Sequence, residues 1–401
     1  MVLAALWAWG CGGEVGSVPA VVTERDSAGI HIVENPAALV EAVLPVSPGP
    51  MVSVGTLEGD PAAQLFRVSA AARLSDGTIV VANGGTRDVR FFGSDGAHLR
   101  TVGGQGRGPE EYRYPVAVLV MPGDTLIVQD RLDRVWYAAD GTFLERVTGD
   151  MGALQALTGP DAFPEGGLWL ADGTLFVPAY LREEGQPRAG PPFRPGIRLL
   201  RASWDLASAE FLGEYGGIQQ QFVEVEPGPR GVMPMVSPYA VSTSYVGVAS
   251  DGTLVVGDSD RPELHVFRAD GARERFRWAA EREVLTPAEV EAWKEAQRAA
   301  GWIGDRLPQF ERGWAAMTMP ETKAAFGHIA GGRDGSVWVP VTFDSAAELS
   351  SFLVFTAEGR LRGRASVPGP FAVMDAGDDW VLGIWRDAND VEYLRLHRVG
   401  P

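Results

Sequence analysis

The chain has 401 residues, of which 45% are hydrophobic and 22% charged, so it is long enough to bury a substantial core. Its formal net charge of -17 is spread along the sequence, which excludes nucleic acids and anionic membrane surfaces as expected partners. The single cysteine, Cys11, excludes an internal disulfide and a cysteine-based zinc site, and the 50 glycines and 28 prolines indicate many turns between short strands.

The first residues resemble a bacterial lipoprotein signal. Met1 to Trp9 is almost entirely apolar and precedes Gly10 and Cys11, the arrangement in which a lipobox cysteine becomes lipidated. We expect residues 1–23 to be a lipoprotein-like signal and linker with Cys11 as the lipidation site. The protein is then extracytoplasmic, either lipid-anchored in the bacterial envelope or periplasmic, and meets the membrane only through the anchor. A cleaved secretory signal and an accidental apolar stretch are the alternatives.

The chain after this segment contains an internal repeat. Its phrase is a tight turn, usually Asp-Gly, then a polar residue and a run of alternating β-branched residues, which predicts a hairpin turn followed by a strand. The acidic residues that mark the copies are Asp76, Asp124, Asp172, Asp251 and Asp334, with a degraded sixth copy at Asp378. Each unit holds four short strands, which is the content of a propeller blade. The sequence therefore predicts an all-β fold, a six-bladed β-propeller of four-stranded antiparallel blades over residues 51–401.

The last blade indicates how the ring closes. Strands are expected near Phe371–Met374, Trp380–Ile384 and Val391–Arg398, after which the chain ends without a fourth strand. Met51–Gly55 matches the phrase of an outer strand and lies ahead of the first blade. We expect this N-terminal strand to complete the last blade and remove its open edge. Residues 24–50 form an N-terminal segment ahead of the propeller.

Two stretches of sequence resemble known proteins. The outer-strand phrase of Val54, Gly59 and Phe66 aligns with Val102, Gly108 and Tyr112. The run from Gly103 to Tyr112 resembles the inter-blade signature of NHL-type repeats. The run from Glu24 to Ile30, ahead of Val33-Glu34-Asn35, resembles the start of bacterial six-bladed propeller lipoproteins. The resemblance implies the architecture and an envelope location, and it implies no activity because the function of this group is mostly unknown.

Extra chain is inserted at three places. The six phrases are separated by 48, 48, 79, 83 and 44 residues, and the surplus lies at Leu181–Gly196, Tyr215–Pro238 and Ala280–Phe326. In a propeller whose strands A to D run outward from the channel, all three belong to the face of the B-to-C and D-to-A loops, so we expect function there. The helical insertion at about 280–326 begins with Thr286-Pro287-Ala288-Glu289, an N-cap, an N1 proline and a capping-box glutamate. This helix, which carries Trp293, is either a lid over the channel mouth or a plug in it.

Four residues are candidates for metal binding or catalysis. Asn83, Asp130 and Asp258 end the second strand of three blades, and oxygen ligands from several blades suit Ca²⁺. The alternative, which we favour, is that they cap the following turns through backbone N–H groups, so no cofactor is expected. His328 begins an inner strand after the helical insertion and is the weak candidate for a catalytic base, with a packed histidine as the alternative.

Ligand binding has more candidates than catalysis. Arg107, Glu110 and Tyr112 combine charge with an aromatic ring, although the same run is expected to fix neighbouring blades. Another group follows the ends of the second strands, where arginines in several blades form a ring suited to an anionic or sugar-like ligand unless they pair with neighbouring acids. Its members are Arg87, Arg131, Arg134 and Arg261.

The sequence contains none of the common enzyme signatures. We therefore expect an extracytoplasmic binding or scaffold module that takes a protein, peptide or glycan ligand on the face bearing the long loops. The alternative is a metal-dependent hydrolase or lyase at the propeller channel mouth.

Overall fold

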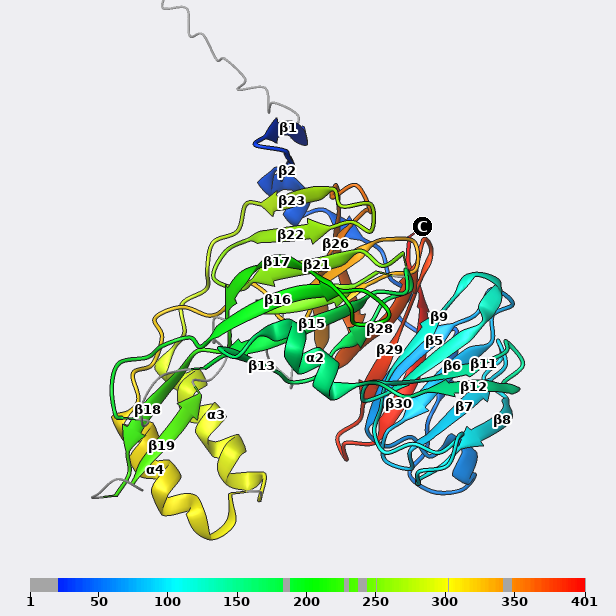
Figure 1. Cartoon of the computed structure of the whole chain (residues 1–401). Helices are drawn as coiled ribbons and strands as arrows, with labels where there is room; N and C mark the ends of the chain where they lie inside the picture. The colour runs from blue at the N-terminus through cyan, green and yellow to red at the C-terminus, as the bar shows by residue number, and fades with distance from the viewer. Residues whose placement is uncertain are drawn as a thin grey trace, which may run out of the picture.

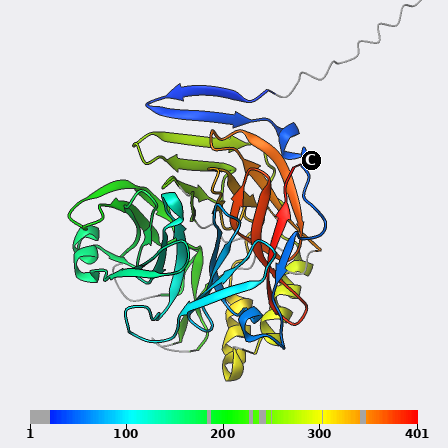
Figure 2. The same cartoon turned by 90° about the vertical axis from the view of Figure 1, so that its right-hand side faces the viewer.

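The computed structural model describes residues 21–182, 188–226, 231–236, 244–249, 251–301, 303–341 and 348–400. Six antiparallel sheets surround a central channel, which confirms the six-bladed propeller (Figures 1 and 2). From the inner to the outer strand, blade 1 consists of β5 (Val68–Arg73), β6 (Ile79–Asn83), β7 (Asp88–Phe92) and β8 (His98–Gly103). Blade 2 consists of β9 (Pro115–Val120), β10 (Leu126–Asp130), β11 (Asp133–Tyr137) and β12 (Phe143–Val147).

The other blades follow the same plan with local changes. In blade 3 the inner strand is split in two: β13 (Ala162–Pro164), β14 (Leu168–Trp169), β15 (Leu175–Leu181), β16 (Gly196–Ala202), β17 (Ala209–Gly216). Blade 4 contains β20 (Ser244–Val248), β21 (Leu254–Asp258), β22 (Glu263–Phe267) and β23 (Arg273–Trp278). Blade 5 contains β24 (Ala330–Gly331), β25 (Val337–Pro340), β26 (Leu349–Phe355) and β27 (Leu361–Pro368).

Blade 6 confirms the predicted ring closure. It contains β28 (Phe371–Gly377), β29 (Trp380–Arg386) and β30 (Glu392–Arg398), and its outer strand is β4 (Val52–Val54) from the start of the propeller. β4 pairs antiparallel with β30, with Val54 opposite Leu394.

The Asp-Gly phrases form the hairpin turns on the opposite face from the long loops. At the first copy, Asp76 Oδ1 accepts the backbone N–H of Thr78 at 2.8 Å, and Gly77 has a φ of 91°, which a glycine adopts without steric cost. The hydrogen bonds from Thr78 hold the pKa of Asp76 below its usual value. Local sequence therefore fixes the turn between the inner strand and the next.

The N-terminal segment forms a belt around three blades (residues 23–54). β1 (Thr23–Ser27) pairs with β2 (Ile30–Asn35), and β2 pairs in parallel with β23, so blade 4 becomes a six-stranded sheet. After α1 (Ala37–Val40), β3 (Val43–Leu44) pairs in parallel with β27 of blade 5. Figures 1 and 2 show this segment, in blue, along the outer edge of blade 4 and then beside the C-terminus.

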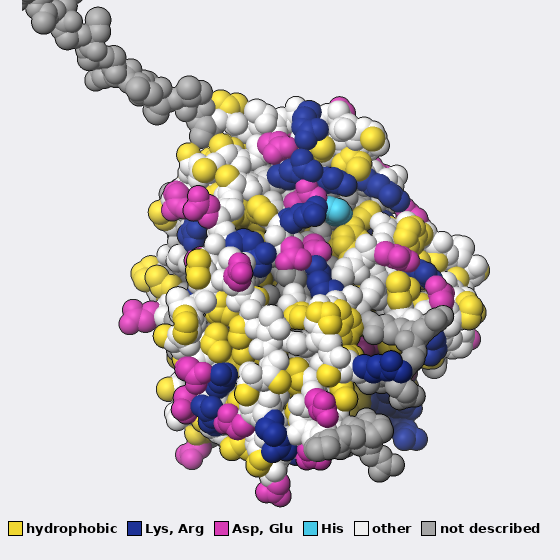
Figure 3. Space-filling model, turned by 90° about the vertical axis from the view of Figure 1, so that its left-hand side faces the viewer, with side chains coloured by type: hydrophobic (Ala, Val, Ile, Leu, Met, Phe, Trp, Pro, Cys, Tyr) yellow, Lys and Arg dark blue, Asp and Glu magenta, His cyan; other side chains and the backbone are white. Residues whose placement is uncertain are grey.

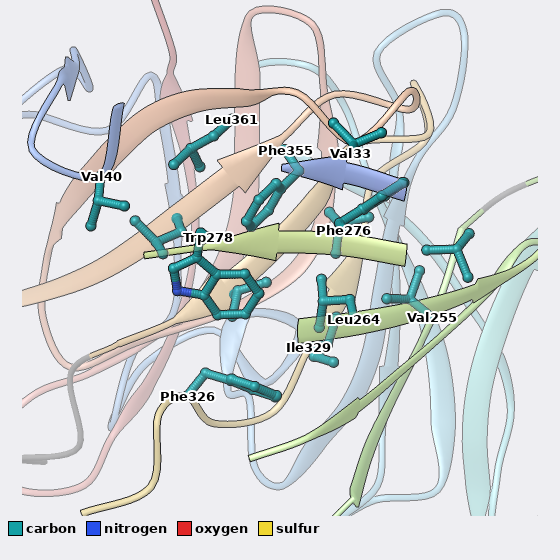
Figure 4. Close-up of a cluster of buried hydrophobic side chains, with 14 residues drawn as sticks. Val33, Val40, Val255, Leu264, Phe276, Trp278, Phe326, Ile329, Phe355 and Leu361 are labelled. Carbon is teal, nitrogen blue, oxygen red and sulfur yellow. The ribbon is translucent and has the colours of Figure 1, made fainter. Parts of the chain in front are cut away.

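The hydrophobic core consists of layers between neighbouring blades. Figure 4 shows the layer between blades 4 and 5, in which Phe276 and Trp278 of β23 lie against Phe355 of β26. Val33 of the belt belongs to the same layer and is fully buried. Phe276, Trp278 and Phe355 are thus core residues that join neighbouring blades.

The three insertions contribute to one insertion lobe, seen at the lower left of Figure 1. It comprises the hairpin β18 (Gln220–Glu224) and β19 (Val232–Val236), the helices α3 (Pro287–Ala299) and α4 (Leu307–Ala316), and the short turn η3 (Gly304–Arg306). Its core includes Val223, Met235 and Trp314, and Trp293 of α3 packs against that core. The remaining short elements are α2 (Met151–Thr158), η1 (Pro61–Ala63) and η2 (Pro122–Asp124).

Helix α3 has the predicted cap. Thr286 Oγ1 accepts the backbone N–H of Glu289, and Glu289 Oε2 accepts the backbone N–H of Thr286 at 2.9 Å. Gly301 follows the helix with a φ of 72°, as expected for a helix stop. No helix in the described part of the chain is long and apolar enough to cross a membrane.

Candidate functional site

The inner strands of the blades enclose a channel with a cavity of about 300 Å³. Small apolar residues such as Ala71, Ala117 and Gly247 make up most of the wall, because the six strands converge there and leave little room for side chains. Among the described residues of the wall, none comes from α3 or α4. Helix α3, whose Trp293 packs against the core of the insertion lobe, therefore does not line the channel.

Two ionisable residues of the channel lie at opposite ends of the inner strands. His328 precedes β24 on the long-loop face, its ring is exposed to the channel, and it lies 6.2 Å from the ring of Tyr245. The surrounding protein lowers the pKa of His328, so the imidazole is neutral at pH 7. Asp375 is near the hairpin face, where burial raises its pKa to about 6 and it accepts the backbone N–H of Arg73 at 2.9 Å.

The three oxygen-bearing candidates for a metal site bind protein groups in this structure. Asn83 Oδ1 accepts the N–H of Phe66 at 2.8 Å, and its amide donates to Thr86 Oγ1. Asp130 accepts the N–H groups of Arg113 and Tyr114 and pairs with Arg146 at 2.6 Å. These contacts position the D-to-A loop against the B-to-C turn.

The third of these residues, Asp258, pairs with Arg194 at 3.0 Å. Since all three are used in this way, they do not fit a shared Ca²⁺ site. In the described part of the chain, no three side chains among His, Cys, Asp and Glu are grouped so that they could hold a metal ion.

The run from Gly103 to Tyr112 contains buried and exposed residues with different roles. Tyr112 is fully buried between blades 1 and 2, and its hydroxyl lies 2.7 Å from that of Tyr137. Burial raises the pKa of both phenols, that of Tyr137 to about 12. Arg107 and Glu110 are exposed on the loop. Tyr112 therefore joins blades, and only the other two candidates in this run can meet a ligand.

The alignment of Phe66 with Tyr112 is wrong by one residue. Leu65, which is 5% exposed, occupies the buried position, whereas Phe66 is 57% exposed. The equivalent residues Asn83 and Asp130 show the correct alignment. Asn83 accepts the backbone N–H of Phe66, and Asp130 accepts that of Arg113, so Leu65 corresponds to Tyr112. Phe66 is thus displaced from the core onto the surface.

Arginines and aromatic rings gather where the loops of blades 1 to 3 border the channel. The guanidinium carbon of Arg67 lies 5.1 Å from the centre of the Phe66 ring, and that of Arg87 lies 5.1 Å from the centre of the Tyr114 ring in the next blade. We call the following seven residues the aromatic–arginine rim: Phe66, Arg67, Arg87, Tyr114, Arg131, Phe163 and Arg182.

The remaining predicted residues lie in three places. Arg261 is exposed in the B-to-C turn of blade 4, away from the rim. Trp293 is partly buried in the insertion lobe, 5.6 Å from the ring of Trp314. Cys11 lies outside the described residues. The structure thus places Arg87 and Arg131 beside the same residue, Tyr114, and places Arg261 and Trp293 elsewhere.

Arg194, which the sequence did not single out, ties the insertions to the propeller. Its guanidinium lies 3.0 Å from Asp258 and 2.8 Å from Asp260, and it donates to the carbonyls of Gly216 and Gly217. These groups belong to the B-to-C loop of blade 4 and to the chain that leaves blade 3. A guanidinium suits this position because it donates in several directions from one rigid plane.

The surface on the left-hand side of Figure 1 is electrically mixed. Figure 3 shows basic and acidic side chains close together on one face, with a gathering of basic side chains around a histidine. One such network links Glu263 to His265 at 2.8 Å and to Arg277, and these partners lower the pKa of Glu263 to about 2. Paired charges of this kind stabilise the surface and leave little net charge for a ligand.

Comparison with known proteins adds structural neighbours only. No family model matches the chain, and no curated protein matches it. A member of the DUF4221 family from Bacteroides vulgatus is 10% identical, with 90% of this chain and 99% of that chain covered and a TM-score of 0.49.

Two enzymes are among the other neighbours. A gluconolactonase from Xanthomonas campestris is 13% identical, with 88% and 97% covered and a TM-score of 0.37. Virginiamycin B lyase from Staphylococcus aureus is 10% identical, with 83% and 94% covered and a TM-score of 0.36. At these identities and TM-scores the similarities carry no inference about activity.

Proposed function

We propose that the protein is an extracytoplasmic binding or scaffold module whose ligand, a protein, peptide or glycan, docks on the face of the B-to-C and D-to-A loops. We also propose that it belongs to the NHL-type bacterial lipoprotein group and has a lipid anchor at Cys11. Metabolic labelling with palmitate tests the anchor, and label that persists in Cys11→Ser would contradict it.

The observation that supports binding is the insertion lobe. Parts of three insertions from different loops meet there: Gly190 N–H bonds to the carbonyl of Phe222 at 3.1 Å, and Thr318 N–H bonds to Gln221 Oε1 at 2.8 Å. A closed propeller needs none of this chain for its own core. Chain that is added on one face and given a core of its own is typical of a surface that contacts another molecule.

A ligand screen tests this proposal. Thermal shift of the purified protein is measured with a panel of oligosaccharides and peptides, for the wild type and for variants on each face. Arg87→Ala represents the loop face, and Arg100→Ala, on the exposed outer strand β8, is the matched control. We expect a stabilising ligand whose effect is lost in Arg87→Ala and kept in Arg100→Ala. A ligand that depends on the hairpin face and not on the loop face would refute the proposal.

The alternative is a metal-dependent hydrolase or lyase at the channel mouth. It is supported by the exposure of the neutral His328 ring to the channel. Thermal shift with Ca²⁺, other divalent cations and EDTA separates the two functions. A marked loss of stability with EDTA supports the alternative, whereas a binding module without a metal shows no shift with cation or chelator.

A further inference from the structure

The aromatic–arginine rim presents two exposed rings on a fixed backbone. Phe66 and Tyr114 are 57% and 58% exposed, although residues of this type are usually buried in a propeller. Their backbone N–H groups bond at 2.8 Å and 2.6 Å to the buried side chains of Asn83 and Asp130. The backbone that carries the rings is therefore fixed before any ligand arrives, which lowers the entropic cost of binding.

The rim joins blade 1 to blade 2 through Tyr114, and blade 3 carries a similar pair of an aromatic residue and an arginine. A side chain on Gly85 would collide with the Phe66 ring, so Gly85 gives that ring its room. The N–H of Arg131 bonds to the carbonyl of Tyr114 at 3.3 Å. In blade 3 the guanidinium carbon of Arg182 lies 5.6 Å from the centre of the Phe163 ring. The rim borders the channel, because Ser69 and Val116, two residues beyond Arg67 and Tyr114, line its wall.

The arginines of the rim carry positive charge that the described part of the chain does not neutralise. No ion pair joins Arg67, Arg87 or Arg131 to a carboxylate among the residues that the structure describes. The protein as a whole carries a net charge of -17, and many of its other arginines, such as Arg194, Arg268 and Arg277, pair with carboxylates. Three cations without an acidic partner, on an acidic protein, indicate a complementary anionic ligand.

The backbone conformation of these arginines also indicates a functional position. Arg67, Arg87 and Arg131 have φ angles of 54°, 59° and 60°, in the left-handed region where a Cβ atom is strained. On the opposite face the chain mostly uses glycine for this conformation, as at Gly77 and Gly252, with φ angles of 91° and 83°, although Asp124 and Leu206 also adopt it there. Strained residues that keep a long charged side chain are typical of functional positions.

We propose that the aromatic–arginine rim binds a short acidic oligosaccharide, with sugar rings stacked on Phe66 and Tyr114 and carboxylates held by Arg67, Arg87 and Arg131. This inference rests on the proposed binding function and names its ligand class. A sugar ring offers an apolar C–H face to an aromatic ring, and a uronate carboxylate matches the planar fork of a guanidinium. A neutral glycan leaves the guanidinium groups unused, an acidic peptide leaves the aromatic faces unused, and a long polyanion is repelled by the acidic remainder of the surface.

The test is calorimetric titration of the whole protein with a linear tetramer of galacturonic acid. Its controls are a neutral tetramer of glucose and a tetraglutamate peptide. The rim variants are Arg87→Ala and Tyr114→Ala. The matched controls are Arg100→Ala and Trp204→Ala, whose side chains are exposed away from the rim. Melting temperatures confirm that each variant is folded.

We expect the uronate tetramer to bind, both control ligands to bind at least tenfold more weakly, and each rim variant to lose about tenfold or more in affinity. Affinity should fall with added NaCl, because charged contacts are screened. Arg100→Ala and Trp204→Ala should bind as the wild type does.

Other results overturn the inference in distinguishable ways. Equal binding of tetraglutamate would show that charge alone is recognised and refute the sugar. Uronate binding that survives in both rim variants would refute the site. If no uronate binds but another compound from the panel binds and requires Arg87, the ligand class is wrong and the proposed function stands. If no compound of the panel depends on the loop face for binding, both this inference and the proposed binding function are refuted.

Discussion

Replacing Arg194 with methionine should loosen the insertion lobe, because this guanidinium joins the insertions to blade 4. It makes five hydrogen bonds, to both oxygens of Asp258, to Asp260 and to the carbonyls of Gly216 and Gly217. Loss of one partner of a fully buried ion pair costs about 3–5 kcal/mol. Here Asp258 and Asp260 are 34% and 36% exposed and can be rehydrated, so we expect about 2 kcal/mol.

Hydrogen exchange followed by mass spectrometry locates this loss. A cost of about 2 kcal/mol raises exchange in β18, β19 and α4 by up to about thirtyfold if the lobe opens separately from the propeller. The control is Arg273→Met, whose single ion pair with Glu210 is 3.2 Å long and about half exposed, so its loss should cost no more than about 1 kcal/mol. Equal exchange in the two variants, or uniform acceleration over all blades in Arg194→Met, would refute the role of Arg194 as a link.

Three further changes test other parts of the structure. Asn35→Ala should lower the free energy of unfolding by about 2–3 kcal/mol, because it removes hydrogen bonds to the carbonyls of Arg277 and Gly359 and to the N–H of Leu361. Urea denaturation measures this loss, with the exposed Asn389→Ala as control. A loss near zero in Asn35→Ala would contradict the prediction. Burial lowers the pKa of His397, so the stability that the neutral imidazole contributes is present above the unfolded-state pKa of about 6.5 and is lost as the pH falls below that value. In urea denaturation, His397→Phe should therefore lose less stability than the wild type between about pH 7 and pH 5. An equal loss in the two proteins would be inconsistent with this. Arg87→Gly should leave the free energy of unfolding unchanged or raise it by up to about 1 kcal/mol, because the relief of about 1–2 kcal/mol of backbone strain exceeds the entropic cost of glycine. The control Arg100→Gly, in the middle of β8, should be destabilising. A clear loss of stability in Arg87→Gly would argue against strain at its φ of 59°.

Local signals in the sequence predicted those parts of the fold that short-range interactions determine. The turns at Asp76 and its repeats, the closing strand near Val54 and the cap at Thr286 each depend on neighbouring residues and are found where expected. The helix α4 was not expected, because its N-cap residue Arg306 makes no side-chain capping bond and Gly313 interrupts its pattern. Its position depends instead on contact with the β18–β19 hairpin, which no local pattern reveals.

The candidate site could be predicted only in part for the same reason. Arg87 and Arg131 were identified because each follows a recognisable strand. Phe66 and Tyr114 were not singled out as surface residues, since an aromatic residue near a strand is usually buried, and the one-residue shift between Leu65 and Phe66 decides which side chain is exposed. Pairing across blades, such as Arg87 with Tyr114, depends on the closed ring and has no signature in either segment.

The belt explains how the ring tolerates long insertions between its blades. A short D-to-A connection keeps neighbouring blades close, and a longer loop does so less well because its closure costs more entropy. The longest connection runs from β23 to β24, between blades 4 and 5. At this junction the belt adds Val33 to the shared core, and Asn35 bonds to the backbone of both blades. β2, β3 and β4 then join blades 4, 5 and 6 in succession, so the N-terminal chain connects blades where the insertion weakens the direct link. The belt thus supplies a second connection across the junction that carries the longest insertion.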